Sequence, residues 1–232
     1  MISHLFSIFL LYLHLCAIKL SFLPIGTRSI FSALCLFVFL IDSKSAILSK
    51  RLLKPFIWLS LWGILSLVSI FLNPSDYSPD LFVLWEIISQ VNAFLASAFV
   101  AYLFFFVLGY SYKKILILSV WVIIIFATTG LLSAIFPVLS DFYLSIQGAK
   151  DNYWLEHSLL VSGYRFIGIG PSFFGAGVLI SIGLLIVCWL LNQEKSPKAV
   201  VGYIIAFIYL SVTGLFFART TLVGILIGLC FI

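Results

Sequence analysis

The sequence predicts an all-α protein, a polytopic transmembrane helix bundle with seven full spans and a partial eighth. Of its 232 residues, 63% are hydrophobic and only 9% are charged, whereas a soluble domain carries about a quarter charged residues. So few charges cannot cover a surface that faces water, and lipid must therefore be the solvent for most of the chain. Several apolar stretches also reach the roughly 20 residues that a helix needs to cross a bilayer.

The expected spans follow one another along a single integral membrane domain, residues 1–232. Apolar runs place the seven spans at residues 3–22, 29–41, 55–72, 81–108, 115–136, 172–192 and 199–217. The second run is short for a full crossing, but it is long enough if it begins at Ile25. An eighth helix begins near Thr221 and has only 12 residues, about 18 Å of helix. We therefore expect the chain to be truncated at its carboxyl end.

The basic residues alternate between loops in the way that orients membrane proteins. The predicted loops at 42–54, 110–114 and 193–198 hold eight of the thirteen Lys and Arg residues. Alternate loops, such as 73–80, hold most of the acidic residues. Because cytoplasmic loops are enriched in Lys and Arg, the N-terminus is expected in the cytoplasm, and the loop at about 137–171 is expected outside.

Several function classes are excluded by the same residues. The net charge is +5, but the basic residues lie in short loops rather than on a basic helix, so no nucleic acid partner is expected. The four cysteines lie in apolar spans without a C-x-x-C pair, so no metal site is expected. The stretch GIGPSFFGAG lacks both the spacing and the strand–helix context of a dinucleotide-binding loop, and no Gly-Lys-Ser/Thr follows it.

The predicted outer loop, residues 137–171, is the longest connection in the chain. Long loops are often functional, and His157 within it could act as a base. The loop also carries several aromatic side chains, which leave two interpretations open. They could stack on sugar rings, or they could form an interfacial belt that holds an amphipathic segment at the lipid headgroups.

Two arginines precede helix starts on the predicted outer side. Arg165 lies upstream of a helix expected to begin at Pro171 or Ser172, and proline is well suited to a first turn. Arg219 precedes Thr220 and Thr221 at the start of the eighth helix, where a hydroxyl could cap free N–H groups. Helix starts attract anions, and guanidinium groups bind phosphate in a bidentate manner. The sequence therefore predicts a diphosphate site, although a lone interfacial arginine could equally bind lipid headgroups.

Glu86 is the third candidate for a functional residue. It lies about 8 Å inside the fourth span and shares a helical face with Ser89, Gln90 and Ser97. An ionisable side chain at such depth indicates function and requires a partner, and either outer arginine could pair with it. A structural ion pair that locks the bundle is an equally open interpretation.

The two arginine segments resemble a known family. YRFIGIGPSFFGAGVLISIGLLI, followed one span later by GLFFARTTLVGILIGL, is similar to the O-antigen polymerase (Wzy) and O-antigen ligase family of polytopic membrane proteins. Arg165 matches the first arginine of the family and Arg219 the second, while Ala218 replaces the usual serine. The topology resembles the N-terminal portion of the family, which usually continues with a large outer loop and further helices.

The resemblance implies a function that the residues alone do not name. Members of the family are glycosyltransferases of the bacterial inner membrane that act on polyprenyl-diphosphate-linked oligosaccharides at the periplasmic face, without a cofactor. Arg165 and Arg219 would then bind the substrate diphosphate, with Glu86 and His157 in supporting roles. Membrane lipid and other polysaccharide-assembly membrane proteins are the implied partners. A transporter or flippase for lipid-linked saccharides and an inactive truncated remnant are the alternatives.

Overall fold

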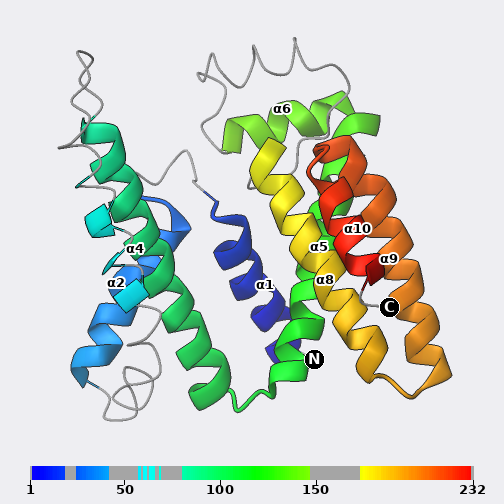
Figure 1. Ribbon diagram of the computed structural model, residues 1–232, viewed down its shortest axis with the longest axis horizontal. Helices are drawn as coiled ribbons and strands as arrows, with labels where there is room; N and C mark the ends of the chain where they lie inside the picture. The colour runs from blue at the N-terminus through cyan, green and yellow to red at the C-terminus, as the bar shows by residue number, and fades with distance from the viewer. Residues whose placement is uncertain are drawn as a thin grey trace. The chain divides into compact units, whose positions relative to one another are not determined.

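The computed structural model describes residues 2–18, 25–41, 57–58, 60–61, 63–65, 68, 80–146 and 173–230. Within these residues every regular element is a helix, as the sequence predicted. The helices are α1 (Ile2–Cys16), α2 (Thr27–Ile41), α4 (Asp80–Tyr102), the π-helix η1 (Leu103–Val107), α5 (Tyr112–Ile135), α6 (Pro137–Ile146), α8 (Phe173–Gln193), α9 (Pro197–Phe217) and α10 (Thr221–Cys230) (Figure 1).

Four stretches of helix are long and apolar enough to cross a membrane. They are Ile87–Val107, Tyr112–Ile135, Gly175–Gln193 and Pro197–Phe217. They coincide with the fourth to seventh predicted spans, and the chain is therefore assigned as a helical membrane protein. Helices α1, α2 and α10 are apolar but shorter, and most of the expected third span lies outside the described residues. Seven full spans and a partial eighth stay a prediction.

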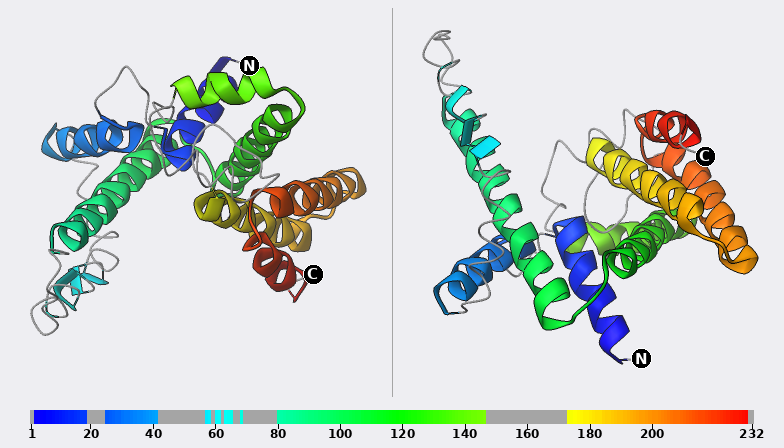
Figure 2. Two further views of the ribbon diagram at one scale, coloured as in Figure 1. Left: turned by 90° about the horizontal axis from the view of Figure 1, so that it is seen from above. Right: turned by 60° about the horizontal axis from the view of Figure 1, so that its bottom comes forward.

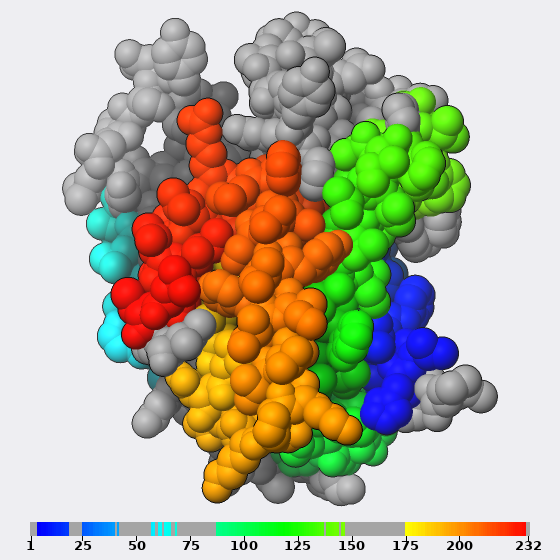
Figure 3. Space-filling model, turned by 90° about the vertical axis from the view of Figure 1, so that its right-hand side faces the viewer, coloured from blue at the N-terminus to red at the C-terminus, as the bar shows by residue number. Residues whose placement is uncertain are grey.

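The chain divides into two compact units, which are described one at a time. The first comprises Met1–Thr27 and Ser111–Ile232, and the second comprises Arg28–Tyr110. In the first unit, α8 packs against α5, α9 and α10, and α1 packs against α5. Figure 2 shows α10 beside α8 and α9 in both views. Figure 3 shows α10, α9 and α5 next to one another on one face of this unit.

The core of the first unit lies where α5, α8 and α9 meet. Ile123, Ile180, Leu184 and Leu210 are fully buried there. Equally apolar side chains cover the outside of α9, where Ile205 is 62% exposed. Lipid tails are as apolar as these side chains, so hydrophobicity does not separate the inner face from the outer face. Close packing must therefore select the helix faces that meet.

Small residues bring α10 unusually close to α8. A Cβ atom added to Gly224 would lie 2.5 Å from Ser181 Cβ and 2.7 Å from Ser181 Cα. One turn further along α10, a Cβ atom on Gly228 would lie 3.0 Å from Cys188 Sγ. This Gly-x-x-x-Gly spacing is typical of helices that pack in membranes with their backbones in close approach.

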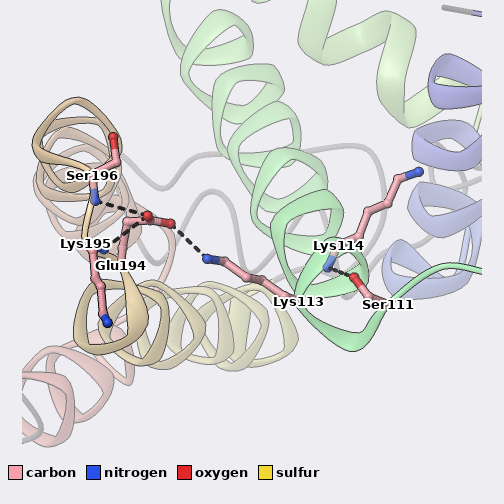
Figure 4. Close-up of polar contacts among 6 residues, drawn as sticks. All are labelled: Ser111, Lys113, Lys114, Glu194, Lys195 and Ser196. Carbon is pink, nitrogen blue, oxygen red and sulfur yellow. Dashed lines mark hydrogen bonds and ion pairs between the residues drawn. The ribbon is translucent and has the colours of Figure 1, made fainter.

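An ion pair joins the start of α5 to the α8–α9 loop (Figure 4). Lys113 Nζ lies 2.9 Å from Glu194 Oε2, and Glu194 Oε1 accepts hydrogen bonds from the backbone N–H groups of Lys195 and Ser196 at 3.1 and 3.2 Å. Two of the basic loops, 110–114 and 193–198, thus lie at the same end of this unit. That placement agrees with the alternation of charge along the sequence.

We expect this contact to stabilise the protein at neutral pH and to weaken in acid. The hydrogen bond from Lys113, aided by those from the Ser196 and Lys195 backbone, lowers the pKa of Glu194. A carboxylate with a lowered pKa stabilises the fold above its unfolded-state pKa of about 4.3 and loses that effect as the pH falls through its folded-state pKa. Glu194→Gln should therefore melt below wild type at pH 7, by a small margin because the pair is exposed.

The measurement is the melting temperature in detergent of wild type and Glu194→Gln between pH 7 and pH 3. The difference between the two proteins should shrink below about pH 4. Asp141→Asn is the matched control, because Asp141 is exposed on α6 and forms no ion pair within the described residues. A difference for Glu194→Gln that stays constant with pH would contradict the prediction.

Helix α6 occupies the start of the predicted outer loop. The loop was predicted from residue 137, and Pro137–Ile146 is helical. Phe136 has an extended backbone, with φ −120° and ψ 94°, and Pro137 then occupies a first turn, where its missing N–H is not needed. Tyr143 packs inward and is 6% exposed, while Phe142 is 53% exposed. Figure 1 shows α6 running across the end of α5.

Candidate functional site

The candidate site centres on the turn between α9 and α10, which contains Arg219. Only three residues separate Phe217, the last residue of α9, from Thr221, the first residue of α10. Ala218 has an extended backbone, and its N–H donates to the Gly214 carbonyl at 3.0 Å. The chain therefore reverses sharply and presents Arg219 at the end of the unit opposite to the ion pair of Lys113.

The two threonines of this turn do not cap α10 as the sequence suggested. The Thr221 hydroxyl is fully buried and donates to the Gly214 carbonyl at 3.0 Å. It thereby pairs with a carbonyl near the end of α9 rather than with an N–H group at the start of α10. The Thr220 hydroxyl is buried and has no hydrogen-bond partner within the described residues. Gly214 leaves room for this arrangement, since a Cβ atom there would lie 2.5 Å from Thr221 Cγ2.

The first N–H groups of α10 are also occupied. Thr221 N–H donates to the Ala218 carbonyl, Leu222 N–H to the Arg219 carbonyl and Val223 N–H to the Thr220 carbonyl, at 3.0–3.1 Å. The tight turn supplies these carbonyls, which is why the donors predicted to be free at this helix start are paired. An anion at this end must rely on Arg219 and on the helix dipole.

Arg219 itself is available to a ligand. It is exposed, and its side chain makes no ion pair or hydrogen bond within the described part of the chain. The turn that carries it is anchored on both sides by buried residues, namely Phe217 at 1% exposure and Thr221 at 0%. The guanidinium group thus projects from a rigid base, which limits the entropy lost on binding.

The start of α8 packs directly against this turn. A Cβ atom on Gly177 would lie 2.7 Å from Ala218 Cβ and would overlap the Thr220 hydroxyl oxygen. Gly177 ends the glycine stretch that follows Arg165 in the sequence. The start of α8, which ends the first motif segment, therefore contacts the turn of the second motif segment at one end of the unit. Within the described residues α8 begins at Phe173, two residues after Pro171.

The other predicted site residues are not brought to this turn by the described structure. Arg165 and His157 lie outside the described residues. Glu86 belongs to α4 of the second unit, one residue before the apolar stretch Ile87–Val107, and its side chain also lies outside them. Ser97, which shares its predicted face, donates to the Ala93 carbonyl of its own helix at 2.8 Å. Pairing of Glu86 with an arginine stays a prediction.

A polar groove in the second unit was missed by the sequence analysis. Asn92 of α4 donates from Nδ2 to the Ser29 hydroxyl of α2 at 2.9 Å, and Ser32 and Ser89 line the same groove. The available signal was a pair of polar residues three positions apart in each helix, a spacing that places them on one face. Within the described residues no cluster of three His, Cys, Asp or Glu side chains could hold a metal ion.

Comparison with family models, curated proteins and solved structures gave no match to this chain. The four long apolar helices assign it to the membrane proteins. Any finer assignment must come from the site residues, and above all from the turn that presents Arg219.

Proposed function

We propose that the chain is a polysaccharide polymerase-like glycosyltransferase that acts on polyprenyl-diphosphate-linked oligosaccharides at the periplasmic face of the bacterial inner membrane. The contact of Gly177 with Ala218 and Thr220 carries this proposal. It joins the helix that follows Arg165 to the turn that presents Arg219. Arg165 would then add a second guanidinium group at this end of the unit, and the two groups would match the two phosphates of a lipid-linked sugar.

The proposed reaction transfers a sugar chain from its diphosphate carrier to an acceptor hydroxyl. The acceptor oxygen forms a bond to the anomeric carbon, and the bond from that carbon to the diphosphate oxygen breaks. The bond electrons leave with the diphosphate, whose developing charge Arg219 and Arg165 would stabilise. The acceptor proton passes to a base, for which His157 is the candidate. Glu86 would orient an arginine through an ion pair.

The proposed topology follows from charge. The chain would cross the membrane in seven full spans and a partial eighth. The basic loops would then place the N-terminus in the cytoplasm. The end that holds Lys113, Lys195 and Lys198 would then face the cytoplasm, where basic loops are enriched. The Arg219 turn, at the opposite end of α9, would face the periplasm together with α6. Membrane lipid and other polysaccharide-assembly membrane proteins would surround the chain.

Replacing Arg219 or Arg165 with alanine is expected to lower polymer formation at least about 100-fold, the usual effect of losing one group that stabilises a developing charge. Arg219→Lys should retain part of the activity, because it keeps the charge but not the planar fork. The measurement is polymer length on gels, in cells that lack their own polymerase and produce this chain. An immunoblot of the membrane fraction confirms equal protein levels.

Lys198→Ala is the matched control, because it removes an exposed positive charge from the opposite end of α9 and should leave polymer length unchanged. Normal polymer length in both arginine variants would contradict the proposal. So would a wild-type chain that makes no polymer, which would favour an inactive remnant. Movement of the lipid-linked substrate across vesicle membranes without polymerisation would favour a transporter.

A further inference from the structure

The second unit contains a groove between α2 and α4 with a volume of about 380 Å³. Small-molecule sites usually measure about 300–1,000 Å³. Four polar side chains line it, with Ser29 and Ser32 from α2 and Ser89 and Asn92 from α4. Ser89 and Asn92 are the third and sixth residues of the apolar stretch Ile87–Val107. The groove therefore lies near one end of an apolar stretch that is long enough to cross a membrane.

Helix packing explains only part of this polarity. The hydrogen bond of 2.9 Å from Asn92 to Ser29 joins the two helices, as polar side chains often do in membranes. Ser32 is only 7% exposed, and within the described residues its hydroxyl makes no hydrogen bond. A buried polar group is costly when it lacks a partner. The Ser32 hydroxyl therefore points to a ligand that supplies its partner, and the exposed hydroxyl of Ser89 is open to the same ligand.

The chemistry of the lining selects an uncharged ligand. Among the described residues, none of the side chains that line the groove carries a charge, so these residues offer no cation to a phosphate or carboxylate. Hydroxyl and amide groups both donate and accept hydrogen bonds. A ligand with several hydroxyl groups offers the same combination in return.

The remaining wall shows how such a ligand would be anchored. Ile88, Val91 and Leu95 complete the lining, and Ile88 is 59% exposed on the outside of α4. A polar head in the groove would leave an attached hydrocarbon chain lying along this apolar surface. We propose that the groove binds the neutral, hydroxyl-rich head of a membrane lipid, as in a monohexosyl diacylglycerol. This site is distinct from the Arg219 turn and does not depend on the proposed function.

The test is native mass spectrometry of the purified full chain in detergent with monoglucosyl diacylglycerol, diacylglycerol or phosphatidylglycerol. Wild type should retain the glucosyl lipid in preference to the other two. Asn92→Ala and Ser32→Val should each weaken that binding about 2- to 10-fold, the effect of losing one hydrogen bond. Ser97→Ala is the matched control, because Ser97 lies on α4 but donates to its own helix, and it should bind as wild type does.

Melting temperatures of the variants separate lost binding from lost folding. Ser32→Val replaces the hydroxyl with a methyl group, adds a second methyl group and removes no hydrogen bond from the described structure, so it should melt near wild type and still bind less. Equal retention of diacylglycerol, a preference for phosphatidylglycerol, or displacement by free glucose at the same concentration would each overturn the proposal. Absence of any bound lipid would also overturn it and leave water as the occupant.

Discussion

Replacing Gly224 with valine is expected to separate α10 from α8 and to destabilise the protein by about 3 kcal/mol or more, the upper range for an overpacked core. The reason is that the added Cβ atom would meet the backbone of α8, with Ser181 Cα at 2.7 Å. A flexible side chain can turn away, whereas a helix backbone cannot. The measurement is unfolding by SDS in mixed micelles, followed by tryptophan fluorescence or circular dichroism.

A graded series of glycine variants sharpens this prediction. A Cβ atom on Gly228 would meet side chains rather than backbone, with the Cys188 sulfur at 3.0 Å and the Phe207 ring at 3.4 Å, so Gly228→Val should cost less than Gly224→Val. Gly202 lies on α9 with no atom within 4 Å of its added Cβ, so Gly202→Val should change stability little. Equal stability of all three variants would contradict the close approach of α8 and α10.

The existence of the helices could be predicted well because long apolar runs are a strong compositional signal. The run predicted at 199–217 corresponds to α9, Pro197–Phe217, and the start predicted at Thr221 is that of α10. Helix α6 could not be predicted in the same way, because its ten residues mix polar and apolar side chains and follow α5 with only Phe136 between.

The pairing of the helices was beyond the sequence analysis for a physical reason. Apolar residues cover both the inner and the outer faces of α5, α8 and α9, so periodicity does not mark the core. The spacing of Gly224 and Gly228 did carry information about packing, because close backbone approach requires small residues. That signal would have predicted the contact of α10 with α8.

The place of Arg219 between two helices could be predicted, but the hydrogen bonds around it could not. The sequence placed Arg219 in a turn at the same end as the start of α8, and the contact of Gly177 with Ala218 agrees with this placement. The pairing of the first α10 N–H groups and the Thr221 bond to Gly214 depend on the tightness of the turn. No residue pattern specifies that geometry in advance.

The second large effect is expected at Phe217, which immediately precedes the Arg219 turn. Its ring is 1% exposed and stacks on Phe126 of α5, with ring centroids 5.1 Å apart and an interplanar angle of 28°. Phe217→Ala should cost about 3 kcal/mol, because a buried phenyl ring leaves a cavity that its neighbours cannot fill. Phe216→Ala is the matched control, since Phe216 is 48% exposed and faces lipid.

Gly130 of α5 allows a test of whether the effect of Phe217 comes from the packing of α5 against α9. A Cβ atom on Gly130 would overlap the Phe217 ring, so Gly130→Ala alone should destabilise the protein. Phe217→Leu shortens the side chain and makes room for the added methyl group. The double variant should therefore lose about 0.5–3 kcal/mol less stability than the two single variants lose in sum. If the two losses of stability simply add, the contact between Gly130 and Phe217 is contradicted. Because Phe217 anchors the turn, Phe217→Ala should also lower polymer formation, while Phe216→Ala should not.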